Sequence, residues 1–407
     1  MEYIQLLPNA EFIYYGEDGC VFDLFNRRNH YCKKKYVEEF KQLLNGKPYI
    51  EAELNKDLVH YIETLMDEGL VYIYNNKVFH EPFYEKSKQE IRGLFEEPPV
   101  FNNIFIQASE YCGYDCVFCK EQGHHNVNNS CETCIKWGDK KEKYDLENQI
   151  TNILRILKLH HTKITFSGGN TFAAWEENRK IIEVIFNESP DTEIHIVHNG
   201  EPISKEIIND LKKYSVIINL IVFGYDSESF YKVTQNKDSY ANFLSSLKVF
   251  ENEKIPIKLV AIGSKENLKK IKECQFNNND IVSCHIYDKY ELDDENRFAV
   301  RMNKDTDAQF MDRKYNRCLY GKMAMTRNGL IKPCPSFSDS IVDLKYESLD
   351  SAFKRQGFDK YWRMNRKNLE ICGKCPYQWN CNDCMKVVLE ANQNKKEFEI
   401  LCDRIKN

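Results

Sequence analysis

The stretch Cys112-Gly113-Tyr114-Asp115-Cys116-Val117-Phe118-Cys119 decides how the rest of this chain is interpreted. It places three cysteines at C-x3-C-x2-C spacing directly after an apolar run, residues 100–108, which we expect to form a strand. With 16 cysteines in 407 residues, roughly 0.03 such triplets would arise by chance. Three thiolates on one short loop can hold three irons of a four-iron cluster and leave the fourth iron open to another ligand. The triplet therefore predicts a metal centre at the end of a strand.

Strand and helix patterns alternate downstream of this stretch. We expect strands at 100–108, 163–167, 193–198, 216–223, 257–262 and 281–287. We expect helices at 146–159, 175–186, 204–213, 240–250 and 265–274. The pattern predicts an α/β fold with an open, partial (β/α)6 barrel over residues 100–299 rather than a closed barrel of eight units. In such barrels the chemistry lies at the C-terminal ends of the strands, where the cysteine triplet falls.

Composition narrows the class of protein. The chain is 42% apolar with a net charge of −5, which predicts a folded protein of two or three domains without a basic field for nucleic acid. No apolar run is long enough to span a membrane, and the N-terminus has no signal-peptide pattern, so we expect a cytoplasmic protein with no membrane partner. Cysteines in a reducing compartment favour metal or redox chemistry over disulfides.

The triplet, with the aromatic Phe118 before its last cysteine, resembles the signature of the radical S-adenosylmethionine (SAM) superfamily. The resemblance implies that Cys112, Cys116 and Cys119 bind a 4Fe-4S cluster whose free iron chelates the amino and carboxylate groups of SAM. Reductive cleavage would then release a 5′-deoxyadenosyl radical that abstracts hydrogen from a substrate. It also implies an electron donor such as flavodoxin or ferredoxin. No side chain beyond the cofactor ligands is assigned a catalytic role.

Three stretches at strand ends are candidates for contacts with SAM. Gly168-Gly169-Asn170, after the second strand, resembles the Gly-rich motif that lies against the SAM amino group, where small residues permit close approach. Family motifs often have Glu and Pro where this chain has Asn170 and Thr171. His198-Asn199 and Tyr225-Asp226, after the third and fourth strands, are candidates for the ribose and carboxylate, and each pair could equally be turn residues.

Residues 1–85 predict a small separate domain, joined to the barrel by a helical linker at 86–99 that ends in prolines. Hairpins at 11–25 and 70–80 flank helices at 35–44 and 55–66, which is a winged-helix pattern. The second helix carries Asp57, Glu63, Asp67 and Glu68, a face that would repel phosphate. The domain instead resembles the recognition element of maturases that act on ribosomally made peptides, where a leader peptide adds a strand beside a helix.

A basic cluster in this domain could attract an acidic leader peptide, although an ordinary solvated loop explains it equally well. Its members are Arg27, Arg28, Lys33, Lys34 and Lys35. A second ambiguous group, His124, His125, Cys131 and Cys134, could bind zinc or could belong to a plain loop over the active site.

Residues 300–407 hold a dense second set of cysteines, which resembles the SPASM extension of radical SAM peptide-modifying enzymes. By the family's interleaved pattern, one auxiliary 4Fe-4S cluster takes Cys318, Cys334 and Cys384, and the other takes Cys372, Cys375, Cys381 and Cys402. The last spacing is x2 where the family has x3. Seven thiolates cannot complete two sites of four, so the first cluster is expected to have an open iron. A structural zinc ribbon is the alternative.

The resemblance implies a radical SAM/SPASM maturase with three 4Fe-4S clusters that modifies a ribosomally synthesised precursor peptide (RiPP). The reaction implied is thioether formation between a Cys sulfur and a carbon of another residue. Alternatives are carbon–carbon crosslinking, epimerisation, or formylglycine formation of the anaerobic sulfatase-maturing type, whose members place an acidic residue where this chain has Pro335. A non-enzymatic peptide-binding scaffold is a further alternative, but it would be expected to have lost the triplet.

Overall fold

The structure is a computed structural model in two compact units. It describes residues 1–15, 17–23, 25, 28–80, 101–120, 133–134, 137, 153, 162–274, 276, 281–286, 315–316, 318–375, 378 and 384–392. One unit comprises Met1–Pro98, Arg301–Arg317 and Met364–Asn382, and the other comprises Pro99–Val300, Cys318–Arg363 and Asp383–Asn407. The predicted linker at 86–99, the helix at 146–159 and most of the loop between the triplet and that helix lie outside the described residues.

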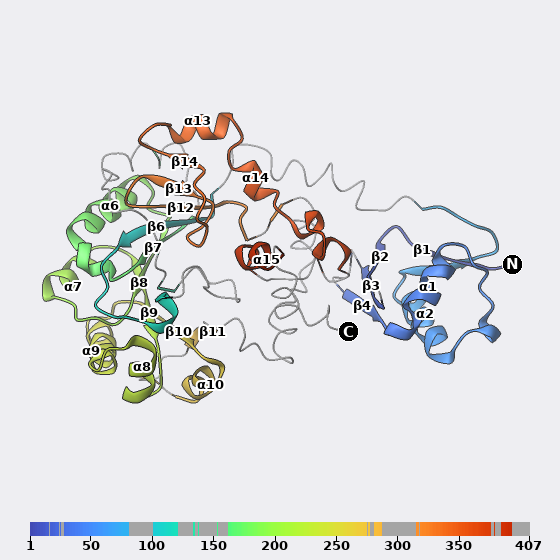
Figure 1. Ribbon diagram of the computed structural model, residues 1–407, viewed down its shortest axis with the longest axis horizontal. Helices are drawn as coiled ribbons and strands as arrows, with labels where there is room; N and C mark the ends of the chain where they lie inside the picture. The colour runs from blue at the N-terminus through green and yellow to red at the C-terminus, as the bar shows by residue number, and fades with distance from the viewer. Residues whose placement is uncertain are drawn as a thin grey trace. The chain divides into compact units, whose positions relative to one another are not determined.

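The second unit is built on a nine-stranded sheet with the order β11-β10-β9-β8-β7-β6-β12-β13-β14 (Figure 1). The strands are β6 (Asn103–Ser109), β7 (Lys163–Gly168), β8 (Glu193–His198), β9 (Val216–Val222), β10 (Ile257–Gly263), β11 (Ile281–Ile286), β12 (Lys322–Met325), β13 (Leu330–Lys332) and β14 (Val342–Asp343). Strands β6 to β11 are parallel, β12 joins β6 in parallel, and β13 and β14 are antiparallel. The expected open α/β sheet is therefore confirmed.

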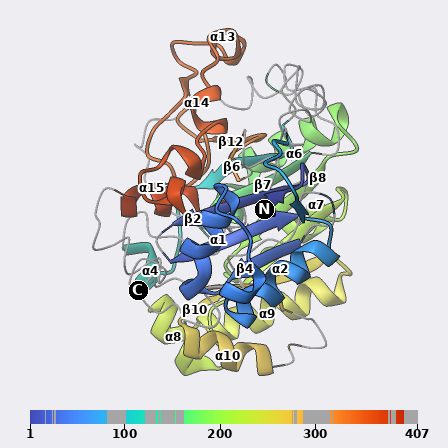
Figure 2. The same ribbon diagram turned by 90° about the vertical axis from the view of Figure 1, so that its right-hand side faces the viewer.

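Helices follow the strands of this sheet. They are α4 (Val117–Lys120), η3 (Thr171–Ala174), α6 (Trp175–Glu188), α7 (Lys205–Leu211), α8 (Ser227–Thr234), α9 (Ser239–Asn252), α10 (Lys265–Glu273), α13 (Leu349–Lys354), α14 (Asp359–Trp362) and α15 (Met385–Asn392). Figures 1 and 2 show α6, α7 and α9 in a row along the sheet. None of the helices within the described ranges is long and apolar enough to cross a membrane.

The register places an apolar row and a mixed row on opposite faces of the sheet. Ile104, Ile164 and Ile194 occupy one row across β6, β7 and β8, and all three are fully or almost fully buried. The neighbouring row carries Phe105, Thr165 and His195. The two rows lie on opposite faces because successive side chains of a strand alternate between them.

The structure adds two features that the sequence pattern did not predict. Helix α8 lies in the connection between β9 and α9. The hairpin β12–β13 continues the barrel sheet at β6, so part of the cysteine-rich C-terminal region belongs to the same sheet as the barrel. Pairing with β12 covers what would otherwise be an open edge of β6.

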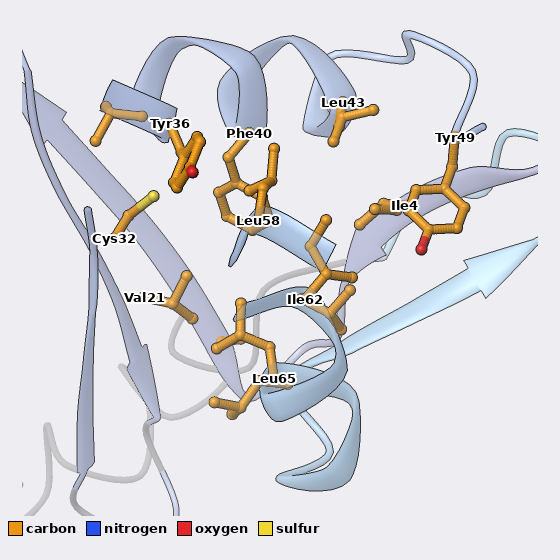
Figure 3. Packing of buried hydrophobic residues seen from close by; sticks show 14 residues of the cluster. Ile4, Val21, Cys32, Tyr36, Phe40, Leu43, Tyr49, Leu58, Ile62 and Leu65 are labelled. Atoms are coloured by element: carbon orange, nitrogen blue, oxygen red, sulfur yellow. The ribbon is translucent and has the colours of Figure 1, made fainter. Parts of the chain in front are cut away.

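The first unit contains two small antiparallel sheets and two main helices. Its elements are β1 (Tyr3–Leu6), β2 (Ala10–Tyr15), β3 (Asp18–Asp23), β4 (Arg28–Cys32), η1 (Lys34–Tyr36), α1 (Val37–Leu44), η2 (Glu51–Glu53), α2 (Lys56–Asp67), β5 (Val71–Tyr74), η4 (Arg366–Asn368) and η5 (Cys372–Lys374). The sheets have the orders β2-β3-β4 and β1-β5. Figure 3 shows the core, in which Ile4, Val21, Phe40 and Ile62 pack together from β1, β3, α1 and α2.

The expected helices and the hairpin β2–β3 are confirmed, but the second hairpin is wrong. Residues 77–80 are not a strand, and β5 pairs with β1. The buried Ile4 of β1 lies opposite Ile73 in that pairing, whereas Phe79 is 88% exposed. The basic segment is not a plain loop either, because Arg28 lies in β4 and Lys33 and Lys35 form ion pairs with Asp57 at the start of α2.

Candidate active site

The cysteine triplet lies in the loop after β6, as predicted. Cys116 is 5% exposed, Cys112 is exposed, and Cys119 lies in the short helix α4. Phe118 stacks on Phe223 with ring centroids 6.1 Å apart, so the aromatic residue of the signature anchors the loop on the end of β9. The Asp115 backbone N–H also donates to the carbonyl of Thr234 at 3.0 Å, which ties the loop to the end of α8.

The thiols of the triplet ionise readily only beside a cation. Burial, and then the charges of Cys119 and Cys112, raise the pKa of the Cys116 thiol. Clustered thiolates of this kind are stabilised when a metal supplies positive charge. Within the described ranges, no three His, Cys, Asp or Glu side chains converge as ligands of a single metal ion. A four-iron cluster does not need such convergence, because each thiolate binds a different iron.

Gly168 and Gly169 pack against the backbone of the cluster loop. Gly168 has a φ of +133°, and a Cβ on it would meet the carbonyl oxygen of Ser109 at 2.6 Å. A Cβ on Gly169 would overlap the carbonyl of Tyr111. The Gly169 N–H donates to the Ser109 carbonyl at 3.0 Å, and the Asn170 N–H donates to the Tyr111 carbonyl at 2.6 Å. Glycine is therefore required here by the cluster loop itself, a reason that the sequence did not reveal.

Asn199 reaches the triplet, whereas His198 turns to the helix-covered face. The Asn199 Nδ2 donates to the Cys112 Sγ at 3.4 Å. His198 is fully buried, with its ring centroid 4.8 Å from Phe172 and 5.9 Å from Phe250. Burial lowers the pKa of His198 to about 3, so its imidazole is neutral at pH 7. The two members of this predicted pair therefore have different roles, because adjacent strand residues point to opposite faces.

Tyr225 and Asp226 have local structural contacts. The Asp226 carboxylate accepts the Ser229 N–H at 2.8 Å and caps α8, and this hydrogen bond is the main reason that its pKa is lowered. The Tyr225 hydroxyl accepts a hydrogen bond from Lys270 at 3.3 Å. These contacts support the turn interpretation of the pair, and their contact with SAM stays a prediction.

Sequence reasoning missed Glu201, a carboxylate that joins the two loops of the site. Glu201 is 7% exposed. Its Oε1 accepts the N–H of Gly113 in the cluster loop at 2.5 Å, and its Oε2 accepts a hydrogen bond from the side-chain amide of Asn170. A Cβ on Gly113 would meet Glu201 Oε1, which explains the glycine after the first cysteine. The available signal was an acidic residue in the turn after β8, just beyond His198-Asn199.

Asn178, on α6, was also missed. It is 1% exposed, and its Nδ2 donates to the carbonyls of Ala108 at 3.0 Å and Thr171 at 2.8 Å. One side chain thus joins the strand that leads into the cluster loop to the segment after the Gly-Gly-Asn motif. An asparagine between charged residues at the start of a helix gives no pattern that would have revealed this role.

Cys318 and Cys334 come to the same end of the β12–β13 hairpin. Cys318 precedes β12 and Cys334 follows β13, and the antiparallel register places Ala324 opposite Lys332. The buried Lys322 donates from Nζ to the Cys318 Sγ at 3.4 Å. Cys384, the third predicted ligand of this auxiliary site, is buried immediately before α15 in the same unit.

The remaining cysteines are only partly described. Cys372 lies on η5 and Cys375 directly follows it, both in the first unit. Cys381, Cys402 and the group His124, His125 and Cys131 lie outside the described residues. Cys134 is buried, and its thiol pKa is raised by burial and then by the charges of Cys112, Cys116 and Cys119. Cys134 therefore lies within electrostatic range of the triplet.

Comparisons with known proteins agree with this geometry. Residues 106–275 match the radical SAM superfamily, and no curated protein matches the sequence. The crystal structure of Streptococcus suis SuiB bound to precursor peptide SuiA is similar, with a TM-score of 0.55 at 15% identity over 96% of this chain and 97% of that one. The histidine-tagged form of anSMEcpe with bound AdoMet gives 0.50 at 15% identity over 75% of this chain and 92% of that one. Native anSMEcpe with AdoMet and the Cp18Cys peptide gives 0.51 at 14% over 75% and 96%.

The site fits an iron–sulfur cluster and SAM. It combines three cysteines on the loop after the first barrel strand with a Gly-Gly-Asn turn packed against that loop. The Asn199 amide and the Glu201 carboxylate also reach the loop. The fold is that of the solved structures above, and the sequence match spans the strands that carry the site. Residues 106–275 therefore form a radical SAM domain, and the chain is a radical SAM enzyme.

Proposed function

We propose that this enzyme modifies a ribosomally synthesised precursor peptide, and that it does so by forming a thioether between a Cys sulfur and a carbon of another residue. The cluster supplies, when SAM is bound and an electron arrives, an adenosyl radical that removes hydrogen from carbon. The likeness to SuiB bound to its precursor peptide extends over 96% of this chain, whereas the anSMEcpe structures leave a quarter of it unmatched. We infer that the first unit takes part in binding the peptide.

The observation that carries the proposal is the edge of the β2-β3-β4 sheet in the first unit. In the described sheet, β4 has a strand partner on one side only, β3. Helix α2 packs against this sheet, because the Tyr61 hydroxyl donates to the His30 carbonyl at 2.9 Å. An edge strand near a helix is the arrangement to which an extended peptide adds a strand.

The chemistry also needs an electron acceptor. Joining a sulfur to a carbon removes one hydrogen from S–H and one from C–H, an oxidation of the peptide by two electrons. One electron leaves with the hydrogen atom that the adenosyl radical abstracts, so the other needs an acceptor. We assign that role to an auxiliary 4Fe-4S cluster on Cys318, Cys334 and Cys384, with the second on Cys372, Cys375, Cys381 and Cys402, which makes three clusters in all. Three thiolates leave room for a substrate sulfur as the fourth ligand of the first site.

A buried lysine lies beside Cys318. The Lys322 ammonium donates to the Cys318 sulfur at 3.4 Å, a contact that a cluster-bound sulfur could also accept. Lys322 and Lys332 also lie in neighbouring strands on the same face of the hairpin, and both are buried. Both could face the negative charge of an iron–sulfur cluster with its thiolates.

Leader binding by the full chain tests the carrying observation. A fluorescently labelled precursor peptide should bind, and His30→Pro should weaken its binding at least about tenfold, because proline disrupts the edge strand β4 to which the peptide would add. Cleavage of SAM without peptide should persist in this variant, because the barrel is intact. Equal leader affinity in the variant would refute strand addition at β4.

The product distinguishes thioether formation from the alternatives. A modified peptide should be lighter by two hydrogen masses and should lose its reactive thiol, whereas epimerisation leaves the mass unchanged and carbon–carbon crosslinking leaves the thiol. Replacing the substrate Cys by Ser should abolish the reaction. A peptide that keeps its thiol after turnover would exclude the thioether.

A further inference from the structure

Glu201 is a buried carboxylate that no cation of the described chain neutralises. It is 7% exposed, and none of the ion pairs found among the described residues includes it. Its two hydrogen bonds, from Gly113 and Asn170, use one acceptor site on each oxygen. An ionised carboxylate has about four such sites, so each oxygen can accept one more hydrogen bond. Burying a charge without a partner is unfavourable, which predicts that a bound cation completes this site.

The two residues that donate hydrogen bonds to Glu201 show where such a cation would bind. Gly113 follows Cys112 directly in the cluster loop, and Asn170 is the third residue of the Gly-Gly-Asn motif. Asn199, two residues before Glu201, donates to Cys112 Sγ through its Nδ2 and accepts the Glu201 N–H through its Oδ1 at 3.2 Å. The carboxylate is thus held at the junction of the cluster loop and the motif next to it, on the same turn as a residue that touches a cluster cysteine.

SAM carries two cationic groups, a sulfonium and an α-ammonium. Only the ammonium has N–H donors that match the open acceptor sites of a carboxylate. We propose that Glu201 binds the α-ammonium group of SAM, and that Asn170, which has no charge, orients Glu201 rather than carrying the negative charge itself. The inference rests on the assignment to the radical SAM superfamily and not on the peptide substrate, so a failed leader-binding test would leave it unaffected.

The test measures ligand binding by the anaerobically reconstituted full chain. Equilibrium dialysis gives the Kd of SAM and of 5′-methylthioadenosine, a probe that keeps the nucleoside and lacks the amino-acid portion. Glu201→Gln should weaken SAM binding about 10- to 100-fold, the range expected for losing a hydrogen bond to a charged group. Its Kd for 5′-methylthioadenosine should stay within about twofold, because that probe has no ammonium. Glu206→Gln, an exposed position at the start of α7, is the matched control and should change neither Kd.

A reciprocal exchange separates the charge from the architecture. In Asn170→Asp/Glu201→Gln the amide and the carboxylate trade places, so their mutual hydrogen bond can form with the donor reversed. The introduced glutamine would keep an oxygen for the Gly113 N–H, and the introduced aspartate would keep one for the Phe172 N–H, which Asn170 accepts at 3.0 Å. The negative charge then sits at the third position of the motif, and SAM affinity should return to within about fivefold of the unsubstituted enzyme.

Two results would overturn the proposal. Equal losses of SAM and 5′-methylthioadenosine affinity in Glu201→Gln would mean that the residue only shapes the pocket. An exchange variant with a full cluster whose SAM binding stays more than about tenfold weaker would mean that a carboxylate at this junction is not what SAM needs. If Glu201→Gln alone fails to hold its cluster, the exchange variant decides between the same two outcomes, because it retains the hydrogen bonds of the junction.

Discussion

Asn178→Ala should loosen the active site without touching any group that contacts the cofactor. The side chain donates two hydrogen bonds at 3.0 and 2.8 Å to the carbonyls of Ala108 and Thr171. Each is worth about 1 kcal/mol, and the lost amide leaves a small cavity, although the Ala108 carbonyl keeps a hydrogen bond from Arg327. We therefore expect the free energy of unfolding to fall by about 2–4 kcal/mol. Asn187→Ala, an exposed asparagine on the same helix, should change it by less than about 0.5 kcal/mol.

The assay is anaerobic denaturant unfolding of the reconstituted enzyme, followed by far-UV circular dichroism, with iron content measured beforehand. The slope of the transition should match in both variants, since neither changes the surface exposed on unfolding. Because Ala108 leads into the cluster loop, Asn178→Ala should also slow SAM cleavage when measured at low temperature, where the variant stays folded. A midpoint within error of that of Asn187→Ala would refute the view that one amide braces both loops.

Three further predictions concern the cluster and the buried histidine. Asn199→Ala removes the amide that donates to Cys112 Sγ at 3.4 Å, and it should lower the reduction potential of the SAM cluster by about 20–60 mV, as seen by electron paramagnetic resonance in a redox titration. Replacing Cys112, Cys116 and Cys119 together should remove about four of about twelve irons and all SAM cleavage, while the spectra of the auxiliary clusters persist; retained cleavage would contradict the ligand assignment. His198 has a folded-state pKa of about 3, below its value of 6.5 when unfolded, so its imidazole takes up a proton on unfolding. The free energy of unfolding should therefore decrease as the pH is lowered below about 6.5, by up to about 1.4 kcal/mol per pH unit. His198→Phe should reduce that slope by one proton, and an unchanged slope between about pH 6.5 and about pH 5 would show that the histidine is not buried as a neutral group.

Strongly periodic stretches were predictable from the sequence, and contacts between distant segments were not. The six barrel strands follow from apolar runs such as residues 216–223, which correspond to β9 (Val216–Val222). The short β1 strand has no pattern of its own that selects β5 as a partner, so the second hairpin was assigned by proximity in sequence and was wrong. Pairing over long separations depends on which apolar surfaces meet, as Ile4 and Ile73 do.

In the candidate site, too, the local spacing was predictable from the sequence and the contacts between distant segments were not. Spacing alone identifies the cysteine triplet, because thiolates on one loop need fixed offsets. Glu201 and Asn178 act through hydrogen bonds to Gly113, Asn170, Ala108 and Thr171, which come together only when β6, β7 and β8 are side by side. The role of His198 depended on which face of β8 it occupies, and the strand's last residue gives no signal of that.

Strand β6 also sets the distance between the cysteine triplet and Cys318, and so the length of a peptide that could contact both. Asn103, at its start, pairs with Lys322 beside Cys318, and Ser109, at its end, leads into the cysteine triplet. Six residue steps at about 3.3 Å each separate these ends by about 20 Å. Both ends belong to one hydrogen-bonded sheet, so no hinge can bring them together. A substrate segment that contacted both at once would need about six residues in extended conformation, and shorter rings would have to be closed at one end only.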